Sequence, residues 1–292
     1  MESNMSILLC RLCFKRPAIE NSHVISALVF RAIKSDSPTG FFRNPNSPNR
    51  RLQDGDKLQL LCTECEQRFG KAEGQFASNV FLPFHGADHC EFSYGPWLHY
   101  FMTSLAWRTL ILDLPGLESD PANPRKAITE LVGAAETMRL YLLGATHLAP
   151  RLENHAVAWT KGDIASAELA AVGPNVIIRR STFGYTILDQ EHEYSAILHN
   201  LAGFMCFLIV RPNPTDTWIG TKVDPMGGQI KQPQQVNSWL IFELLKNLIE
   251  SAQKQAKMSE DEREKIRMAI RRNPSAPALR FRELDKRIIV ND

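Results

Sequence analysis

The sequence predicts an α+β protein in which an amino-terminal zinc module is followed by helices, a small antiparallel sheet and carboxy-terminal helices. Two Cys-x-x-Cys pairs within the first 65 residues indicate the zinc module. Apolar residues recur at three- and four-residue spacing over residues 97–112 and 124–143, which is typical of helices that pack on a core. From about residue 172 onward, β-branched and aromatic runs predict the strands of a sheet.

These changes in pattern divide the chain into three regions. Residues 1–82 form the zinc module, residues 83–170 a helical region and residues 171–292 an α+β region. The strands expected in the last region are residues 176–180, 181–187, 204–210 and 218–223.

The composition is that of an ordinary globular protein, since 44% of its 292 residues are hydrophobic and 23% are charged. The net charge of +2 gives no overall basic surplus that would indicate nucleic acid or a membrane surface. No apolar run reaches the roughly 18 residues that a membrane-spanning helix needs, and the amino end lacks the pattern of a secretory signal. We therefore expect a cytoplasmic protein with reduced thiols and no membrane partner.

Four of the six cysteines belong to the two Cys-x-x-Cys pairs. A disulfide framework is disfavoured in a reducing compartment, and a thioredoxin-like redox site would need one such pair in a βαβ setting. Two pairs can instead supply four thiolates to a tetrahedral zinc ion. We expect a structural Zn²⁺ held by Cys10, Cys13, Cys62 and Cys65.

The segment between the two pairs has a structure of its own. Residues 19–30 are apolar and partly β-branched, which predicts a strand or a strand that runs into a short helix. Residues 35–56 contain three prolines, three asparagines and two glycines, so we expect a loop without regular elements. A short strand over residues 58–62 then leads into a helix from Glu66 onward. Strand, long loop, strand and helix follow one another as in a treble clef.

Several of these residues also resemble a known family. The segments CRLC, NSHVIS and LLCTEC with the following Glu66, and FMTSLAWR at residues 101–108, resemble a widespread bacterial group of HNH-like (ββα-metal) endonucleases. The resemblance covers the first 110 or so residues and is loose beyond them. It implies metal-dependent cleavage of nucleic-acid phosphodiesters in a bacterial protein, in a context that is often defence against phage.

The resemblance also implies catalytic residues. His23 stands at the position of the histidine that serves HNH nucleases as general base for water, while a divalent metal neutralises charge on the phosphate. The family pattern has an acidic residue before this histidine, an asparagine before the second Cys-x-x-Cys pair (each such pair is called a knuckle below), and a further polar ligand on the helix. This chain departs from it at all three points, with Ser22, Lys57 and Glu66.

A pair of glutamates could replace the missing ligands. Glu66 and Glu73 are seven residues apart and share one face of a continuous helix. Together with His23 they offer oxygen and imidazole ligands for Mg²⁺ or Mn²⁺, so we predict all three as catalytic residues. The alternative is a solvated helix face on which the glutamates form weak ion pairs with Arg68 and Lys71.

Positive charge is concentrated near the predicted module. Between Arg11 and Arg51 there are eight Lys or Arg residues but only two acidic ones. Basic residues interleaved with phenylalanines can follow a phosphate backbone and stack on bases. We predict nucleic-acid contacts at Arg43, Arg50, Arg51 and Lys57, with a plain solvated loop as the alternative.

Three further features lie outside this module. His85, His89 and Cys90 have ligand-like spacing, but Pro83 and Gly86 argue against a helix there, which favours surface histidines over a second metal site. Residues 236–252 predict a strongly apolar helix that is buried or contacts a protein partner or a second copy of the chain. Ser259 and Glu262 form a capping box for a charged helix to about Arg272, and we expect residues 272–287 to be a solvated tail or to bind a partner.

The sequence thus favours an HNH-like nuclease. A noncatalytic treble-clef module that binds nucleic acid or a protein is the alternative, and Ser22 and Lys57 argue for it because they stand where metal-binding groups are expected. A scaffold that oligomerises through residues 236–252 is a third hypothesis.

Overall fold

The structure is a computed structural model. It describes residues 8–19, 21–44, 47–52, 55, 57–146, 152–159, 173–189, 191, 194–241, 244–247 and 258–285. Mixed helices and small antiparallel sheets make it an α+β protein, as the sequence predicts. In the part of the chain described, no helix is both long and apolar enough to cross a membrane.

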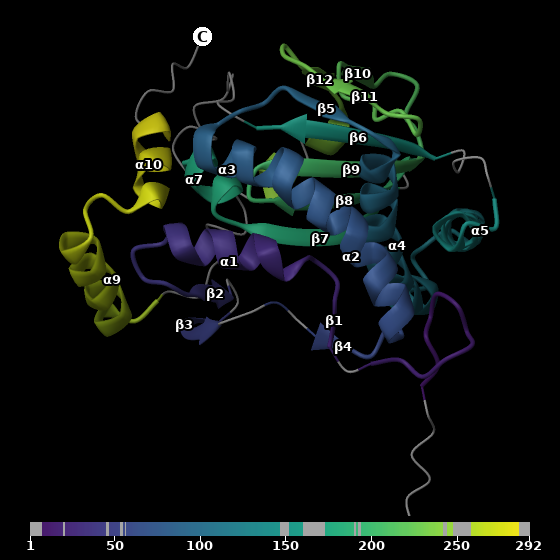
Figure 1. Ribbon diagram of the computed structural model, residues 1–292, viewed down its shortest axis with the longest axis horizontal. Coiled ribbons are helices and arrows are strands. Elements are labelled where there is room, and N and C mark those ends of the chain that lie inside the picture. The colour runs from purple at the N-terminus through teal and green to yellow at the C-terminus, as the bar shows by residue number, and fades with distance from the viewer. Residues whose placement is uncertain are drawn as a thin grey trace, which may run out of the picture.

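The centre of the molecule is a four-stranded antiparallel sheet with the order β6-β9-β8-β7 (Figure 1). Its strands are β6 (Glu153–Ala158), β7 (Thr182–Asp189), β8 (Tyr194–Leu201) and β9 (Phe204–Arg211). The link between β8 and β9 consists of Ala202 and Gly203, both with positive φ. Two consecutive residues with positive φ are the signature of a tight hairpin turn that matches the twist of the strands.

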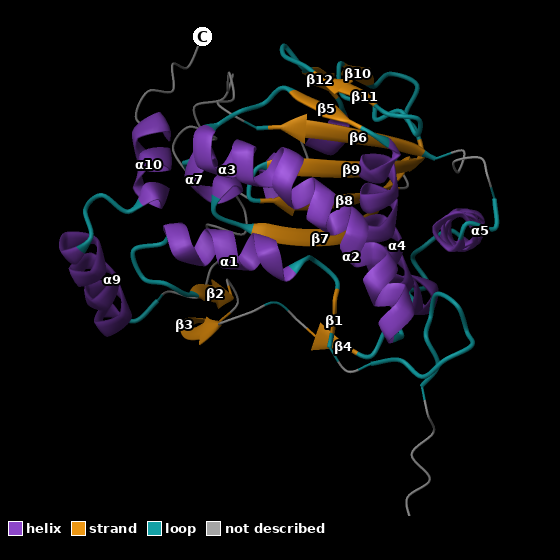
Figure 2. Ribbon diagram, in the orientation of Figure 1, coloured by secondary structure: helices purple, strands orange, loops and turns teal. Residues whose placement is uncertain are grey.

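Both faces of this sheet are covered, which explains why β8 is buried along its whole length. Alternate residues belong to different clusters: Ile197 packs with Trp107 and Leu110 of helix α4 (Pro96–Ser119), whereas Leu198 packs with Leu240 and Leu244. Figure 2 shows α4, and α2 (Thr63–Phe76) beside it, on one side of the sheet.

The two helices predicted from apolar spacing are confirmed. Residues 97–112 lie within α4, and residues 124–143 correspond to α5 (Arg125–Leu143), which packs against α4. After α2 the chain continues through a π-helical turn (Ala77–Phe81) into α3 (Leu82–Ala87). One hydrophobic cluster contains Val29, Phe101 and Phe204, so residues from all three predicted regions share a core.

The amino-terminal region has the predicted strand that runs into a helix. β1 (Ser22–His23) pairs with β4 (Lys57–Leu58) and is followed by α1 (Ala27–Asp36). The expectation that residues 35–56 form no regular element is wrong, because β2 (Phe42–Asn44) and β3 (Ser47–Leu52) form a hairpin. Phe42 rests against Phe30 of α1, with 5.4 Å between ring centroids, a contact that local composition does not reveal.

The other strands are short and lie at one side of the central sheet in Figure 1. β5 (Phe92–Tyr94) pairs with β11 (Gly228–Ile230), and β10 (Thr217–Ile219) pairs with β12 (Gln235–Asn237). Of the predicted strands, 181–187 and 204–210 lie within β7 and β9, and 218–223 overlaps the end of β10.

The strand expected at residues 176–180 is wrong, because the chain forms helix α7 (Pro174–Arg179) there. The Asp285 carboxylate accepts hydrogen bonds from the backbone N–H groups of Asn175 and Val176 at 2.9 and 3.1 Å. These donors at a helix start have no partner within the helix. A residue about 110 positions away therefore stabilises a helix that β-branched composition disfavours.

The carboxy-terminal segment is folded as far as the structure describes it, so the expectation of a solvated tail is wrong for residues up to 285. It contains a short 3₁₀ turn (Pro277–Leu279) and α10 (Arg280–Asp285), and Phe281 is completely buried. The capping box is confirmed: the Glu262 backbone N–H donates to Ser259 Oγ at 3.4 Å at the start of α9 (Glu260–Arg272).

The predicted apolar helix begins after β12. Residues 239–241 and 244–247 are helical, and Leu240 and Leu244 are buried on the central sheet. Residues 242–243 and 248–252 lie outside the described residues. A contact of this segment with a partner or a second copy stays a prediction.

Candidate metal centre and the adjoining polar cluster

The four predicted zinc ligands lie together. The sulfur atoms of Cys10, Cys13, Cys62 and Cys65 are all within 4.8 Å of one another. Cys13 Sγ and Cys62 Sγ are 3.9 Å apart. Four sulfurs at about 2.3 Å from a tetrahedral zinc ion lie about 3.8 Å from each other, whereas a disulfide needs about 2.05 Å. The tetrad can therefore hold a metal such as zinc.

Backbone hydrogen bonds join the two knuckles. In the first knuckle the Cys10 N–H donates to Arg16 O at 2.7 Å, and the Phe14 N–H donates to Cys10 O at 2.8 Å. The Arg11 N–H donates to Leu60 O at 2.9 Å, which places the first knuckle beside the approach to the second. Cys62 is the N-cap of α2 and Cys65 lies in the first turn of that helix.

The surroundings of the sulfurs shift the pKa values of the thiols in opposite directions. Burial, together with the neighbouring thiols, raises the pKa of Cys65. Burial opposes ionisation of Cys13, but the backbone N–H of Lys15 and the three neighbouring thiols lower its pKa to about 7. The backbone N–H groups of Cys13, Cys62 and Leu12 also point to the Cys10 sulfur, although burial outweighs them and raises the pKa of that thiol. Thiolates are the form that binds a metal.

Ser22, which stands where the HNH pattern has an acidic residue, forms a hydrogen bond within the protein. Its side chain is fully buried, and Ser22 Oγ accepts a hydrogen bond from the Leu61 N–H at 3.1 Å. Leu61 directly precedes Cys62 of the tetrad in the sequence. Ser22 thereby joins the strand of His23 to the second knuckle, and pairing of His23 with Lys57 continues this link.

Arg108 connects the strand of His23 with α2 and α4. Its side chain is only 2% exposed. Nη1 donates to His23 O at 2.8 Å, Nη2 donates to Glu73 Oε1 at 2.7 Å, and Nε donates to Ser104 O at 3.2 Å. The guanidinium also lies 5.2 Å from the centre of the Phe69 ring. From the sequence, Arg108 is only the last residue of the segment FMTSLAWR, and no role is predicted for it.

Glu66 lies on the same side of α2. The backbone N–H of His23 donates a hydrogen bond to its carboxylate. Glu66 Oε2 is buried and has no hydrogen-bond partner in the part of the chain described. Burial, and secondarily the charge of Glu73, raise the pKa of Glu66, while Arg108 and His23 act in the opposite direction.

The structure thus places His23, Glu66 and Glu73 around one guanidinium, but it does not make them a compact ligand set. Within the described residues, only the four cysteines bring three or more ligand atoms within 4.8 Å of one another. The alternative of a solvated glutamate face does not describe Glu73, which is ion-paired with buried Arg108. Arg68 instead donates to the backbone oxygens of Leu142 and Leu143.

Two of the four predicted nucleic-acid contacts lie close to the same glutamate. Arg43 and Arg51 approach Glu262 of α9 at 2.7 and 3.5 Å. Both guanidiniums also lie over the Phe41 ring, at 4.8 and 4.4 Å from its centre. Burial lowers the pKa of Arg43, although the Glu262 charge opposes this. Arg50 on β3 and Lys57 on β4 are exposed.

The expectation that residues 85–89 carry surface histidines outside a helix is wrong for His85. A helix forms despite Pro83 and Gly86, because Pro83 occupies the start of α3, where no N–H is required. His85 is buried rather than on the surface, with Nε2 2.8 Å from Asp36 Oδ2 and its ring stacked on Phe81. His89 is exposed. His85, His89 and Cys90, all of them described, do not form a metal cluster.

The resemblance to HNH-like endonucleases rests on the motifs quoted above, while the geometry supports a cysteine metal centre independently of it. No protein-family model, no curated protein and no solved structure matches this chain.

Proposed function

We propose that the protein is an HNH-like, metal-dependent nuclease in which the zinc module presents His23 and Glu66 to a phosphodiester. One observation carries the proposal. Glu66 Oε2 is buried without a hydrogen-bond partner among the described residues, and the same carboxylate accepts a hydrogen bond from the backbone N–H of His23. A buried oxygen without a partner is costly and calls for an explanation such as a bound ion. A divalent cation at Glu66 would supply the missing interaction.

The chain's own residues have distinct parts in this proposal. The His23 imidazole takes a proton from the attacking water, as general bases do in phosphodiester hydrolysis. Glu66 would hold the cation, and Glu73 would contribute to the negative charge beside it. Mg²⁺ or Mn²⁺, when bound, neutralises charge on the phosphate and the leaving oxygen. Because Mg²⁺ keeps several waters and needs only one or two carboxylates, three close protein ligands are not required.

Arg108 stabilises the positions of His23 and Glu73. Its bonds to His23 O and Glu73 Oε1 tie the strand that carries the base to the helix that carries the acids. Arg50 and Lys57 are exposed and would contact phosphates in this proposal, whereas Arg43 and Arg51 are paired with Glu262. Cleavage of foreign nucleic acid is the biological role that this proposal favours.

The test is a cleavage assay on the full chain with plasmid, single-stranded DNA and RNA, in the presence of Mg²⁺ or Mn²⁺. We expect His23→Ala and Glu66→Gln to lower the rate at least about 100-fold, the usual contribution of a general base. His89→Ala and Glu64→Gln are matched controls, because both residues are exposed and Glu64 lies on the same helix as Glu66. Equal cleavage by all four variants would rule out the proposed centre.

A second candidate, the noncatalytic zinc module, is favoured by the position of Arg108. A guanidinium is already bonded to Glu73 and to the His23 carbonyl, so a positive charge lies beside the proposed cation site. In this case the protein would bind nucleic acid or a protein without cutting. Filter binding at increasing salt, together with the cleavage assay, separates the two candidates. Salt-sensitive binding without cleavage by any divalent ion selects the second.

A further inference from the structure

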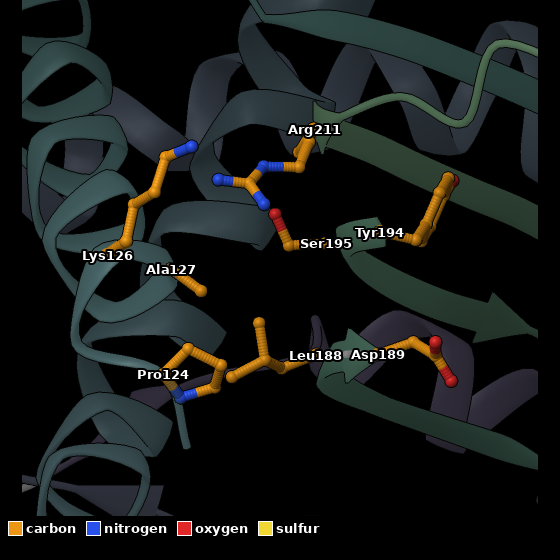
Figure 3. Close-up of a pocket in the computed structure, with 8 residues that line it drawn as sticks. All are labelled: Pro124, Lys126, Ala127, Leu188, Asp189, Tyr194, Ser195 and Arg211. Atoms are coloured by element: carbon orange, nitrogen blue, oxygen red, sulfur yellow. The ribbon is translucent and has the colours of Figure 1, made fainter. Parts of the chain in front are cut away.

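A small pocket lies between the start of α5 and the ends of strands β7, β8 and β9 (Figure 3). It has a volume of about 140 Å³. Pro124, Ala127 and Leu188 form its apolar wall, and Lys126, Ser195 and Arg211 supply polar groups. None of these residues belongs to the metal centre or to the cluster around Arg108, so the pocket is independent of the proposed nuclease.

Ser195 is the most informative residue in the pocket. It is 1% exposed, and its hydroxyl has no hydrogen-bond partner in the described part of the chain. The register between β8 and β9 shifts between Ser195 and Ala196, and such an irregularity redirects a side chain. In Figure 3 the Ser195 hydroxyl points into the pocket, toward the side where the Arg211 guanidinium lies. A buried hydroxyl in this position lacks the partner that a ligand would provide.

Of the two basic side chains that line the pocket, only Arg211 forms an ion pair among the described residues. Arg211 is ion-paired with Glu130 of α5, so their charges offset each other. Lys126 has no ion pair among the described residues, and its ammonium extends to the same side of the pocket as Arg211 (Figure 3). Asp189 also lines the pocket, but its carboxylate points away from both cations.

The first turn of α5 supplies further hydrogen-bond donors, its backbone N–H groups. This helix has 19 residues, its N-cap is Pro124 without a capping side chain, and its first turn contains no acidic residue. The first N–H groups of a helix have no acceptor within it, and the helix dipole favours a negative charge there. The Ser195 hydroxyl, the Lys126 ammonium and the start of α5 therefore all favour the same kind of ligand, an oxyanion.

We propose that this pocket binds a small organic oxyanion, whose oxygens accept hydrogen bonds from Ser195, Lys126 and the first turn of α5. Its short apolar part packs on Pro124, Ala127 and Leu188. A cavity of about 150 Å³ holds a molecule the size of benzene. A short-chain carboxylate or a small phosphate monoester therefore fits, whereas a nucleotide does not.

The test is titration calorimetry of the full chain at constant ionic strength, with sodium butyrate, methyl phosphate and neutral butanol as probes. We expect butyrate, methyl phosphate or both to bind at millimolar concentration or below, and butanol not to bind. The probe that binds more tightly identifies the carboxylate or the phosphate as the preferred group. Lys126→Gln and Ser195→Ala should each weaken binding at least tenfold, because each removes a hydrogen bond to a charged group.

Lys231→Gln is the matched control, since Lys231 is also exposed and does not line the pocket. It should leave the affinity unchanged. Lys126 is on the surface, so Lys126→Gln keeps the test valid even if Ser195→Ala disturbs folding, which circular dichroism detects. Absence of heat with both anions, or equal affinities for wild type and Lys126→Gln, overturns the proposal.

Discussion

Arg108 of α4 donates a 2.7 Å hydrogen bond to Glu73 of α2 from a side chain that is only 2% exposed. The same guanidinium donates a hydrogen bond to the backbone oxygen of His23, so one buried cation joins two helices and the strand that follows the first Cys-x-x-Cys pair. A buried charge is tolerated only when it is paired and hydrogen-bonded. The pair therefore fixes the relative positions of β1, α2 and α4.

Removing either partner should destabilise the protein. Arg108→Met leaves Glu73 without its cation, and Glu73→Gln leaves a buried guanidinium without its anion. Breaking a buried pair in this way costs about 3 to 5 kcal/mol, and we expect the lower part of that range because Glu73 is 20% exposed. The measurement is urea unfolding. Arg271→Met is the control, since its ion pair with Glu264 spans 3.8 Å on the surface and should contribute less than about 0.5 kcal/mol.

The cysteine tetrad predicts one zinc ion per chain. Cys62→Ser removes one of four thiolates and should abolish stoichiometric binding, with loss of the ordered amino-terminal region, because metal binding contributes directly to folding. Elemental analysis of purified protein and thermal unfolding with and without chelator give the readouts. Cys90→Ser is the control, because Cys90 lies outside the tetrad. A preparation that contains no transition metal and unfolds normally would contradict this prediction.

The start of α7 should depend on Asp285. Asp285→Ala removes the acceptor of the Asn175 and Val176 N–H groups and should cost about 1 to 2 kcal/mol, the usual range for the loss of a helix cap. Urea unfolding measures this cost. Asp261→Ala is the comparison, because Asp261 is exposed in the first turn of α9 and that helix keeps its Ser259 cap. Similar small effects of both substitutions would mean that the tail does not cap α7.

The stability of the protein should fall in mild acid because of His199. Burial, with a contribution from Arg108, lowers the pKa of this histidine to about 3, and His199 Nε2 lies 2.8 Å from Thr109 Oγ1. Between about pH 6.5 and pH 3 the unfolded state binds the extra proton, so the free energy of unfolding decreases as the pH falls. At about 1.4 kcal/mol per pH unit, this group contributes a loss of about 2 kcal/mol from pH 7 to pH 5.

Urea unfolding at pH 7 and pH 5 measures this loss. His199→Gln should show a smaller difference between the two pH values than wild type, whereas the exposed control His89→Gln should show the same difference as wild type. Other groups that titrate in this interval contribute equally to all three proteins. An undiminished difference in His199→Gln would show that His199 is not the group responsible.

Local patterns predicted much of the fold. The helices over residues 97–112 and 124–143 were identified from apolar spacing, the capping box from Ser259 and Glu262, and the metal ligands from two Cys-x-x-Cys pairs. In each case the information lies within a few residues of the chain. Apolar periodicity selects the buried face of a helix whatever it packs against, and cysteine pairs at this spacing are a recurrent zinc-binding unit.

The features that sequence analysis missed depend on distant partners. Residues 176–180 resemble a strand by composition, yet Asp285 stabilises a helix there. The hairpin within residues 42–52 is held by Phe30 and by Glu262 of α9. His85 is buried against Phe81, and Asp36 of α1 lies 2.8 Å from its imidazole.

By itself, then, the sequence determined the α+β class, the four cysteines that can hold a metal, and the principal helices, because each is encoded by spacing along the chain. Only the tertiary structure decided that Arg108 lies between His23 and Glu73, and that Ser195 faces a pocket beside α5. The physical reason is that a buried charge or hydroxyl derives its role from the groups packed around it. Those groups come from strands and helices far apart in the sequence, so local sequence patterns do not predict them.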